Sequence, residues 1–96
     1  MGGPVYGLWL ANTKEAFFQL SQAEKDALMA KRNANLAQVG GKDIPGYKLY
    51  AAPWELFGIV EYPNAEALRE HELFCNSLDW RRYFEMTIMC GEKSPE

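Results

Sequence analysis

Cysteine and histidine are scarce in this sequence, with 2 and 1 residues among 96. Cys75 and Cys90 are too few for a disulfide framework, and neither has the neighbouring His or Cys that a tetrahedral zinc site needs. We therefore expect two free thiols, no bound metal and a reducing, cytoplasmic location.

Long hydrophobic runs are also missing. The clearest apolar run, residues 56–60, covers about five residues, whereas a helix needs about 20 to cross a bilayer. The first residues, 1–4, carry no basic segment of the kind that opens a secretory signal. We expect neither a membrane span nor a secretory signal.

An excess of positive charge is absent as well. The chain has 10 Lys and Arg against 13 Asp and Glu, a net charge of −3 and a pI near 5.2. Such a chain has no strong field for displacing phosphate counterions, so nucleic acid is excluded as an expected partner. No phosphate-binding loop or dinucleotide fingerprint is present, and we expect no cofactor.

What the sequence does have is the composition of a folded domain. Hydrophobic residues make up 48% and charged residues 24% of the chain, close to globular averages. A chain of this length supports one core, so residues 1–96 are predicted to form a single domain. Residues 1–3 and 92–96 are expected to be flexible.

Residues 4–12 predict a first strand that is apolar on both faces. Tyr6, Leu8 and Leu10 alternate with Val5, Trp9 and Ala11. A strand without a solvent face must be covered on both sides. Helices cover one side, and a second copy of the chain is the expected cover for the other.

Residues 21–39 predict a helix. Ser21 and Glu24 form a capping box at its start, and Gly40-Gly41 closes it. Small residues form one stripe at helical spacing and larger ones lie on the other side. We expect the small stripe to approach the sheet and the large side to need another partner. The small stripe comprises Ala23, Ala27, Ala30, Ala34 and Ala37, and the large side comprises Leu28, Met29, Leu36 and Val39.

The remaining chain predicts three more strands and a second helix. Strands are expected over 47–52 and 55–62, joined at Pro53-Trp54, and a last strand over 84–90. Asn64 is predicted to cap the second helix. The order strand, helix, strand, strand, helix, strand is the ferredoxin-like α+β plan, with a four-stranded antiparallel sheet and two helices on one face.

Several segments resemble the dimeric α+β barrel superfamily of antibiotic-biosynthesis-monooxygenase-like proteins, and within it a group of small uncharacterised bacterial proteins. The resemblance lies in residues 20–24, 40–41, 61–65 and 79–84, so it covers nearly the whole chain. It implies a homodimer in which two ferredoxin-like sheets form one barrel. The superfamily includes cofactor-independent monooxygenases, isomerases, cyclases, haem-degrading enzymes and members without known activity, and fold alone does not choose among them.

His71 is the candidate catalytic residue. It shares an expected helix face with Leu68, Cys75 and Leu78, and an apolar setting favours the neutral imidazole that a general base needs. The same position suits a core histidine whose two nitrogens are both hydrogen-bonded. A pairing with Cys75, one turn along, is conceivable, although two residues on one helix are not the usual triad arrangement.

Haem-degrading members of the superfamily use an Asn, a Trp and a His. Asn12, His71 and either Trp54 or Trp80 are the matching residue types here. The chain departs from that pattern because Tyr62, and no tryptophan, stands at the end of the third strand. Asn12 is equally typical of a residue that ends a strand.

Aromatic residues account for 14% of the chain and are suited either to a pocket wall or to core and dimer packing. The candidate ligand-binding residues are Tyr6, Trp9, Asn12, Phe57, Trp80, Tyr83 and Met86. Arg81 and Arg82 can hold a carboxylate or pair with Glu72 or Glu85. Two functions follow: a homodimeric, cofactor-independent enzyme acting on a small apolar or aromatic ligand, or a non-catalytic ligand-binding or assembly module.

Overall fold

The computed structural model describes residues 3–48 and 53–93, which form four strands, two long helices and two short ones. In chain order the elements are β1 (Val5–Thr13), α1 (Glu15–Phe18), α2 (Gln22–Gln38), β2 (Lys42–Lys48), β3 (Leu56–Tyr62), α3 (Ala65–Ser77), α4 (Trp80–Tyr83) and β4 (Phe84–Gly91).

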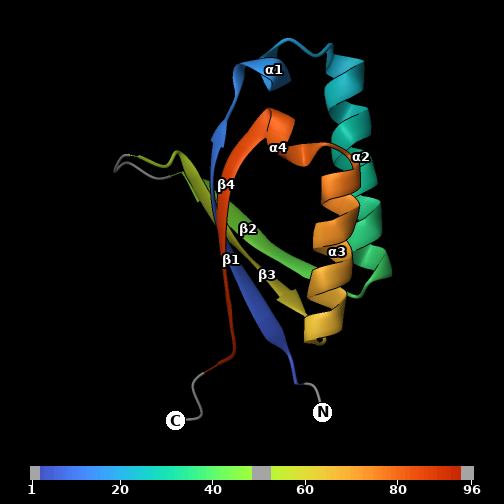
Figure 1. Ribbon diagram of the computed structural model, residues 1–96, viewed down its shortest axis with the longest axis vertical. Coiled ribbons are helices and arrows are strands. Elements are labelled where there is room, and N and C mark those ends of the chain that lie inside the picture. Colours follow the sequence, from blue (N-terminus) through green and yellow to red (C-terminus); the bar gives the residue numbers. More distant parts are fainter. Residues whose placement is uncertain (1–2, 49–52, 94–96) are drawn as a thin grey trace.

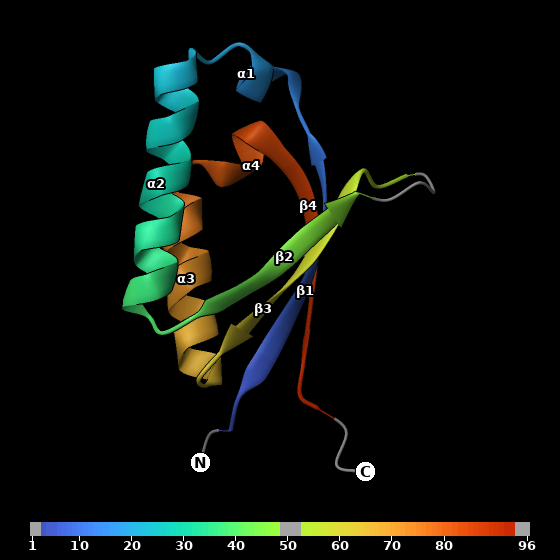
Figure 2. The same cartoon turned by 180° about the vertical axis from the view of Figure 1, so that it is seen from behind.

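The four strands form one antiparallel sheet in the order β2-β3-β1-β4. In this order β3 lies between β1 and β2, which are joined through α2, and β1 lies between β3 and β4, which are joined through α3. This is the ferredoxin-like arrangement predicted from the element order. Helices α2 and α3 lie side by side on one face of the sheet (Figures 1 and 2). Among the described residues, no helix or strand covers the opposite face, which we call the open face.

Both long helices begin where the sequence predicts. The Ser21 hydroxyl accepts from the Glu24 amide (3.1 Å) and the Glu24 carboxylate accepts from the Ser21 amide (2.8 Å), which confirms the capping box. The Asn64 side chain accepts from the Ala67 amide (2.8 Å) and caps α3. Gly40, at a φ of 83°, supplies the left-handed residue that ends α2.

The prediction for the two sides of α2 was wrong. All five residues of the small stripe, Ala23, Ala27, Ala30, Ala34 and Ala37, are exposed, whereas Leu36 is 4% exposed and packs in the core. The large side faces the sheet because it has more apolar area to remove from water. This orientation also turns Arg32 and Asn35 toward the interior, where each is largely covered.

The expected strand over 47–52 is shifted in the structure. Strand β2 begins at Lys42, five residues earlier, and residues 49–52 lie outside the described residues. Its pairing with β3 changes register between Ile44 and Tyr47, around Pro45-Gly46. A proline is tolerated on an edge strand at such an irregularity because the ladder hydrogen bond is already interrupted there.

Two short helices were not predicted. α1 and α4 contact each other at the end of the molecule where β1 ends and β4 begins (Figure 1). Their aromatic rings pack together, with the Phe84 centroid 5.1 Å from that of Phe17 and 4.7 Å from that of Trp80. These rings close one end of the layer between sheet and helices.

The core lies between the sheet and α2 and α3. It is built on Leu36, Val60, Tyr62 and Ala67, each less than 10% exposed. No helix among the described residues is long and apolar enough to cross a membrane, as the short apolar runs predict.

Candidate functional site

A cavity of about 460 Å³ lies between the helices and the covered face of the sheet. That volume is typical of sites that hold small organic molecules. Its walls are mainly apolar, and its polar groups come from α2, β2, β3, α3 and α4. Its lining includes polar, sulfur-containing and aromatic residues: Trp9, Arg32, Asp43, Tyr62, His71, Cys75, Trp80 and Met86.

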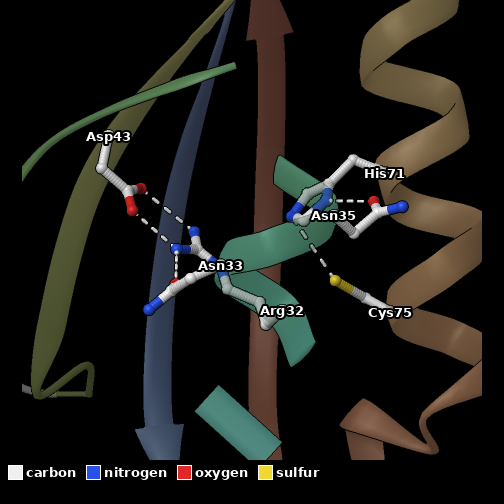
Figure 3. A network of polar contacts seen from close by, with 6 residues as sticks. All are labelled: Arg32, Asn33, Asn35, Asp43, His71 and Cys75. Carbon is white, nitrogen blue, oxygen red and sulfur yellow. Dashed lines mark hydrogen bonds and ion pairs between the residues drawn. The ribbon is translucent and has the colours of Figure 1, made fainter. Parts of the chain in front are cut away.

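His71 lies on the buried side of α3 and is 4% exposed. Its Nδ1–H donates to Asn35 Oδ1 on α2 (2.8 Å), and its Nε2 accepts from the Cys75 thiol (3.6 Å). Figure 3 shows the imidazole between these two partners. Because a carboxamide oxygen only accepts, Asn35 fixes the proton on Nδ1 and leaves the lone pair on Nε2.

The surroundings of His71 keep the ring neutral. Burial, and to a smaller extent the Arg32 guanidinium, lower its pKa from 6.5 to about 4, with Asp43 opposing the shift. At neutral pH the imidazole is therefore an uncharged hydrogen-bond acceptor. A low pKa also makes it a weak base, so it can remove a proton only from a ligand in which that proton is already acidic.

The Cys75 thiol is half-buried one turn further along α3. Burial raises the pKa of this thiol, with Arg32 opposing and Glu72 adding to the shift. The structure thus brings together the Cys75–His71 pair that sequence spacing made conceivable. The pair is a neutral thiol and a neutral imidazole, not the thiolate–imidazolium pair of an activated cysteine nucleophile.

Arg32 and Asp43 form an ion pair between α2 and β2. Asp43 accepts two hydrogen bonds from the guanidinium, at 2.6 and 3.0 Å, and Asn33 accepts a third at 2.9 Å. Burial opposes the charge on Arg32, but the hydrogen bond and the charge of Asp43 outweigh it, so the pKa of Arg32 is raised. In Figure 3 this pair lies toward the strands of the sheet, and the contacts among Asn35, His71 and Cys75 lie toward α3.

Tyr62 ends β3 and is 5% exposed, with its ring centroid 6.1 Å from that of His71. Burial raises the pKa of its phenol, with a smaller opposing effect of Arg32, so the group stays protonated. Among the described residues, no side chain or carbonyl is hydrogen-bonded to this hydroxyl. Since Tyr62 lines the cavity, its O–H is a donor available to a ligand.

Half of the predicted site residues line this cavity. His71, Trp9, Trp80 and Met86 lie in its wall. The placement of Tyr6 and Phe57 beside them was wrong, because strand alternation puts these two on the open face, where Tyr6 pairs opposite Glu61 and Phe57 opposite Leu10. Tyr83 is half-buried in α4 and is not part of the cavity wall.

Asn12 is placed away from the cavity, and its side chain ties three segments together. Its Nδ2 donates to the Pro53 carbonyl (2.8 Å) and to Glu85 (3.3 Å), and its Oδ1 accepts from the Glu55 amide (2.8 Å). This is the role of a strand-ending residue. Asn12, His71 and a tryptophan therefore do not surround one space, and the residues do not fit the haem arrangement.

Trp9 lies flat across Gly58 in the wall of the cavity. A Cβ atom on Gly58 would come within 2.4 Å of the indole ring, so glycine is what permits the close approach. The indole nitrogen is buried and, in the part of the chain that the structure describes, has no hydrogen-bond partner. Its contribution to the cavity is an apolar ring surface.

Four residues of the candidate site were not predicted from the sequence: Arg32, Asn35, Asp43 and Tyr62. A signal existed in the spacing of Met29, Arg32 and Leu36, which places the arginine on the large side of α2. Either Arg81 or Arg82 was expected to pair with Glu72 or Glu85; among the described residues neither does, and Arg81 donates to the Met86 carbonyl at 3.2 Å. Across residues 3–48 and 53–93, no group of three or more His, Cys, Asp or Glu side chains is arranged to hold a metal ion.

No protein-family model matches the chain, and no curated protein matches it in sequence. Solved structures share its fold. A protein of unknown function from Rhodopseudomonas palustris is 18% identical with a TM-score of 0.67, over 99% of this chain and 86% of that one. A proposed monooxygenase from Shewanella loihica is 11% identical with a TM-score of 0.63, over 100% and 99%.

An ethyl tert-butyl ether d family protein from Bacillus halodurans is 17% identical, with a TM-score of 0.57 over 95% of this chain and 99% of that one. Identities of this size carry the fold and not the activity. The chain has a ferredoxin-like α+β fold, the fold class predicted from its sequence, and shares it with these solved structures.

Proposed function

We propose that this protein is a homodimeric, cofactor-independent enzyme that moves a proton on a small apolar or aromatic ligand bound beside His71. The observation that carries the proposal is the cavity of about 460 Å³ that has His71 in its wall. A non-catalytic assembly module needs no such space, because its core can be filled.

The chemistry begins with the lone pair on His71 Nε2, which a ligand reaches once the Cys75 thiol, a weak donor, turns away from it. In the proposed step Nε2 takes a proton from a carbon next to a carbonyl group. The C–H electron pair forms a C=C bond, and the π pair of the carbonyl group moves to its oxygen to give an enolate. Returning the proton at another position completes an isomerisation, and attack by the enolate carbon begins a cyclisation. A monooxygenase of this kind would need dioxygen as the oxidant of the same intermediate.

The weak basicity of His71 narrows the substrate class. A base with a pKa of about 4 is neutral at pH 7 but gains little from accepting a proton. A substrate in which an aromatic ring and a carbonyl group both acidify the same C–H lowers that barrier. The apolar walls contributed by Trp9, Trp80 and Met86 suit such an aromatic ring.

Deuterium exchange tests the proposal without knowledge of the natural substrate. 2-Tetralone in D₂O should lose the proton signal of its benzylic carbon faster with the protein than without it. The variant His71→Gln should slow this exchange by ~10²–10⁴-fold. Leu73→Gln, on the exposed side of α3, is the control and should exchange normally. Binding of the ketone without any acceleration would favour the ligand-binding module instead.

The homodimer is proposed from the open face of the sheet. Ile44, Ile59, Leu8 and Met89 form a continuous row across all four strands, and Met89 is 51% exposed. An apolar sheet face of this extent is unusual on a monomer. A second copy presents the same surface and can cover it through a two-fold contact. Light scattering should give twice the 10.9 kDa mass of the chain, and a stable monomer at micromolar concentration would contradict the dimer.

A further inference from the structure

We propose that Arg32 and Tyr62 bind a negatively charged oxygen of the ligand, so that the ligand class is an aromatic or alicyclic molecule with a carboxylate or an enolate oxygen. This inference rests on the proposed ligand site beside His71 and adds to it the group that the ligand must carry.

The first support is the number of donors that Arg32 has left. A guanidinium has five N–H groups. Three are used, two toward Asp43 and one toward Asn33. The Nε–H and one hydrogen on Nη2 have no partner among the described residues, although the side chain is only 14% exposed. Donors left unpaired beside a cavity are available to a ligand oxygen, and a charged acceptor gains most from them.

The second support is the Tyr62 hydroxyl. It belongs to a residue that is 5% exposed, it lines the same cavity, and it has no partner within the described part of the chain. Arg32 is close enough to Tyr62 to act on the pKa of the phenol, which burial nevertheless keeps protonated. Arg32 and Tyr62 therefore present donors to one region, while His71 presents an acceptor.

The negative groups already in the cavity wall limit how strongly a ligand anion is bound. Asp43 and Glu72 carry negative charge, and Arg32 and Arg81 carry positive charge, so the four balance. Asp43 competes directly with a ligand oxygen for the guanidinium. Removing the charge of Asp43 should therefore strengthen anion binding, which a purely structural role of the ion pair does not predict.

The test compares two ligands of the same shape, 2-naphthoate and 2-naphthamide, by calorimetry, with the His71 ring signal in NMR reporting binding in the cavity. The wild-type protein should bind naphthoate about 10-fold more tightly than naphthamide. Arg32→Met should remove this preference, and Tyr62→Phe should reduce it. Asp43→Asn should strengthen naphthoate binding and leave naphthamide unchanged. Arg69→Met, an exposed arginine of α3, is the matched control.

The outcomes separate this inference from the proposed function. If neither ligand perturbs His71, the ligand site itself fails. If both bind equally and Arg32→Met changes neither, the site stands and the assignment of Arg32 and Tyr62 is wrong. If Arg32→Met does not fold, Asp43→Asn still decides the question. Weaker naphthoate binding by Asp43→Asn would also overturn the inference.

Discussion

The two faces of the sheet are built from the same strands and are both apolar, yet they have different shapes. On the covered face β1 contributes Gly7, Trp9 and Ala11, and the small residues leave room beneath the helices for a cavity. On the open face it contributes Tyr6 and larger aliphatic residues, which form a continuous surface. Apolar alternation therefore predicts that both faces are covered, but residue size decides which face has the cavity, and the helices supply polar residues to it.

The largest expected effect concerns the open face. Leu8→Lys places a charge at the centre of the apolar row and should weaken the proposed dimer by at least ~10²-fold, because an unpaired charge cannot be buried there. The monomer should still fold, since in the monomer this face meets water. Light scattering checks the mass and circular dichroism the fold. Leu73→Lys on α3 is the control, and a dimer unaffected by Leu8→Lys would place the interface elsewhere.

The covered face should make stability depend on pH through His71. Its pKa in the folded protein, about 4, lies below the ordinary 6.5, so the unfolded chain binds the proton more tightly. Stability is then complete above about pH 6.5 and falls as the pH drops toward 4, by about 3 kcal/mol for this shift. Urea denaturation of the wild type and His71→Gln isolates the effect, because carboxylates contribute equally to both. Equal pH slopes would contradict the burial of His71.

The close approach of Trp9 to the sheet should be sensitive to one methyl group. In Gly58→Ala the added Cβ lies within 2.4 Å of the indole, so the ring must move and the free energy of unfolding should fall by about 1–3 kcal/mol. Gly91→Ala is the control, since its Cβ would meet nothing within 4 Å. Chemical denaturation measures both. Equal midpoints for the two variants would show that Trp9 does not rest on Gly58.

The smallest expected effect separates the two thiols. Cys90 is exposed near the end of β4, whereas Cys75 lies on the buried side of α3. Cys75 should react about 10-fold more slowly than Cys90, since it is half-buried and hydrogen-bonded to His71. Mass spectrometry after timed alkylation gives both rates. Faster labelling of Cys75 would indicate an activated thiol.

The sequence predicts the fold well where local chemistry is decisive. The cap at Ser21, the cap at Asn64 and the alternation in β1 each specify an element within a residue or two. The start of β2 was missed because Pro45 and Gly46 look like a turn, whereas the structure accommodates them as an irregularity of an edge strand.

The site was predicted only in part, for a physical reason. Periodicity places His71 and Cys75 on one buried helix face, and this was correct. Asn35, the partner of His71 Nδ1, and Arg32 come from α2, whose orientation depends on which side buries more apolar area against the sheet. With the small stripe expected to face inward, Arg32 and Asn35 could not be recognised as site residues.

The buried, neutral imidazole of His71 is the central feature of the candidate site. His71 is the only histidine in the sequence, so its NMR signals need no assignment. We expect the nitrogen spectrum at pH 7 to show a neutral ring with the proton on Nδ1, titrating near pH 4, and its Nε2 signal to shift when 2-tetralone is added. A ring that titrates near 6.5 and does not respond to the ketone would contradict both the buried acceptor and the ligand site built on it.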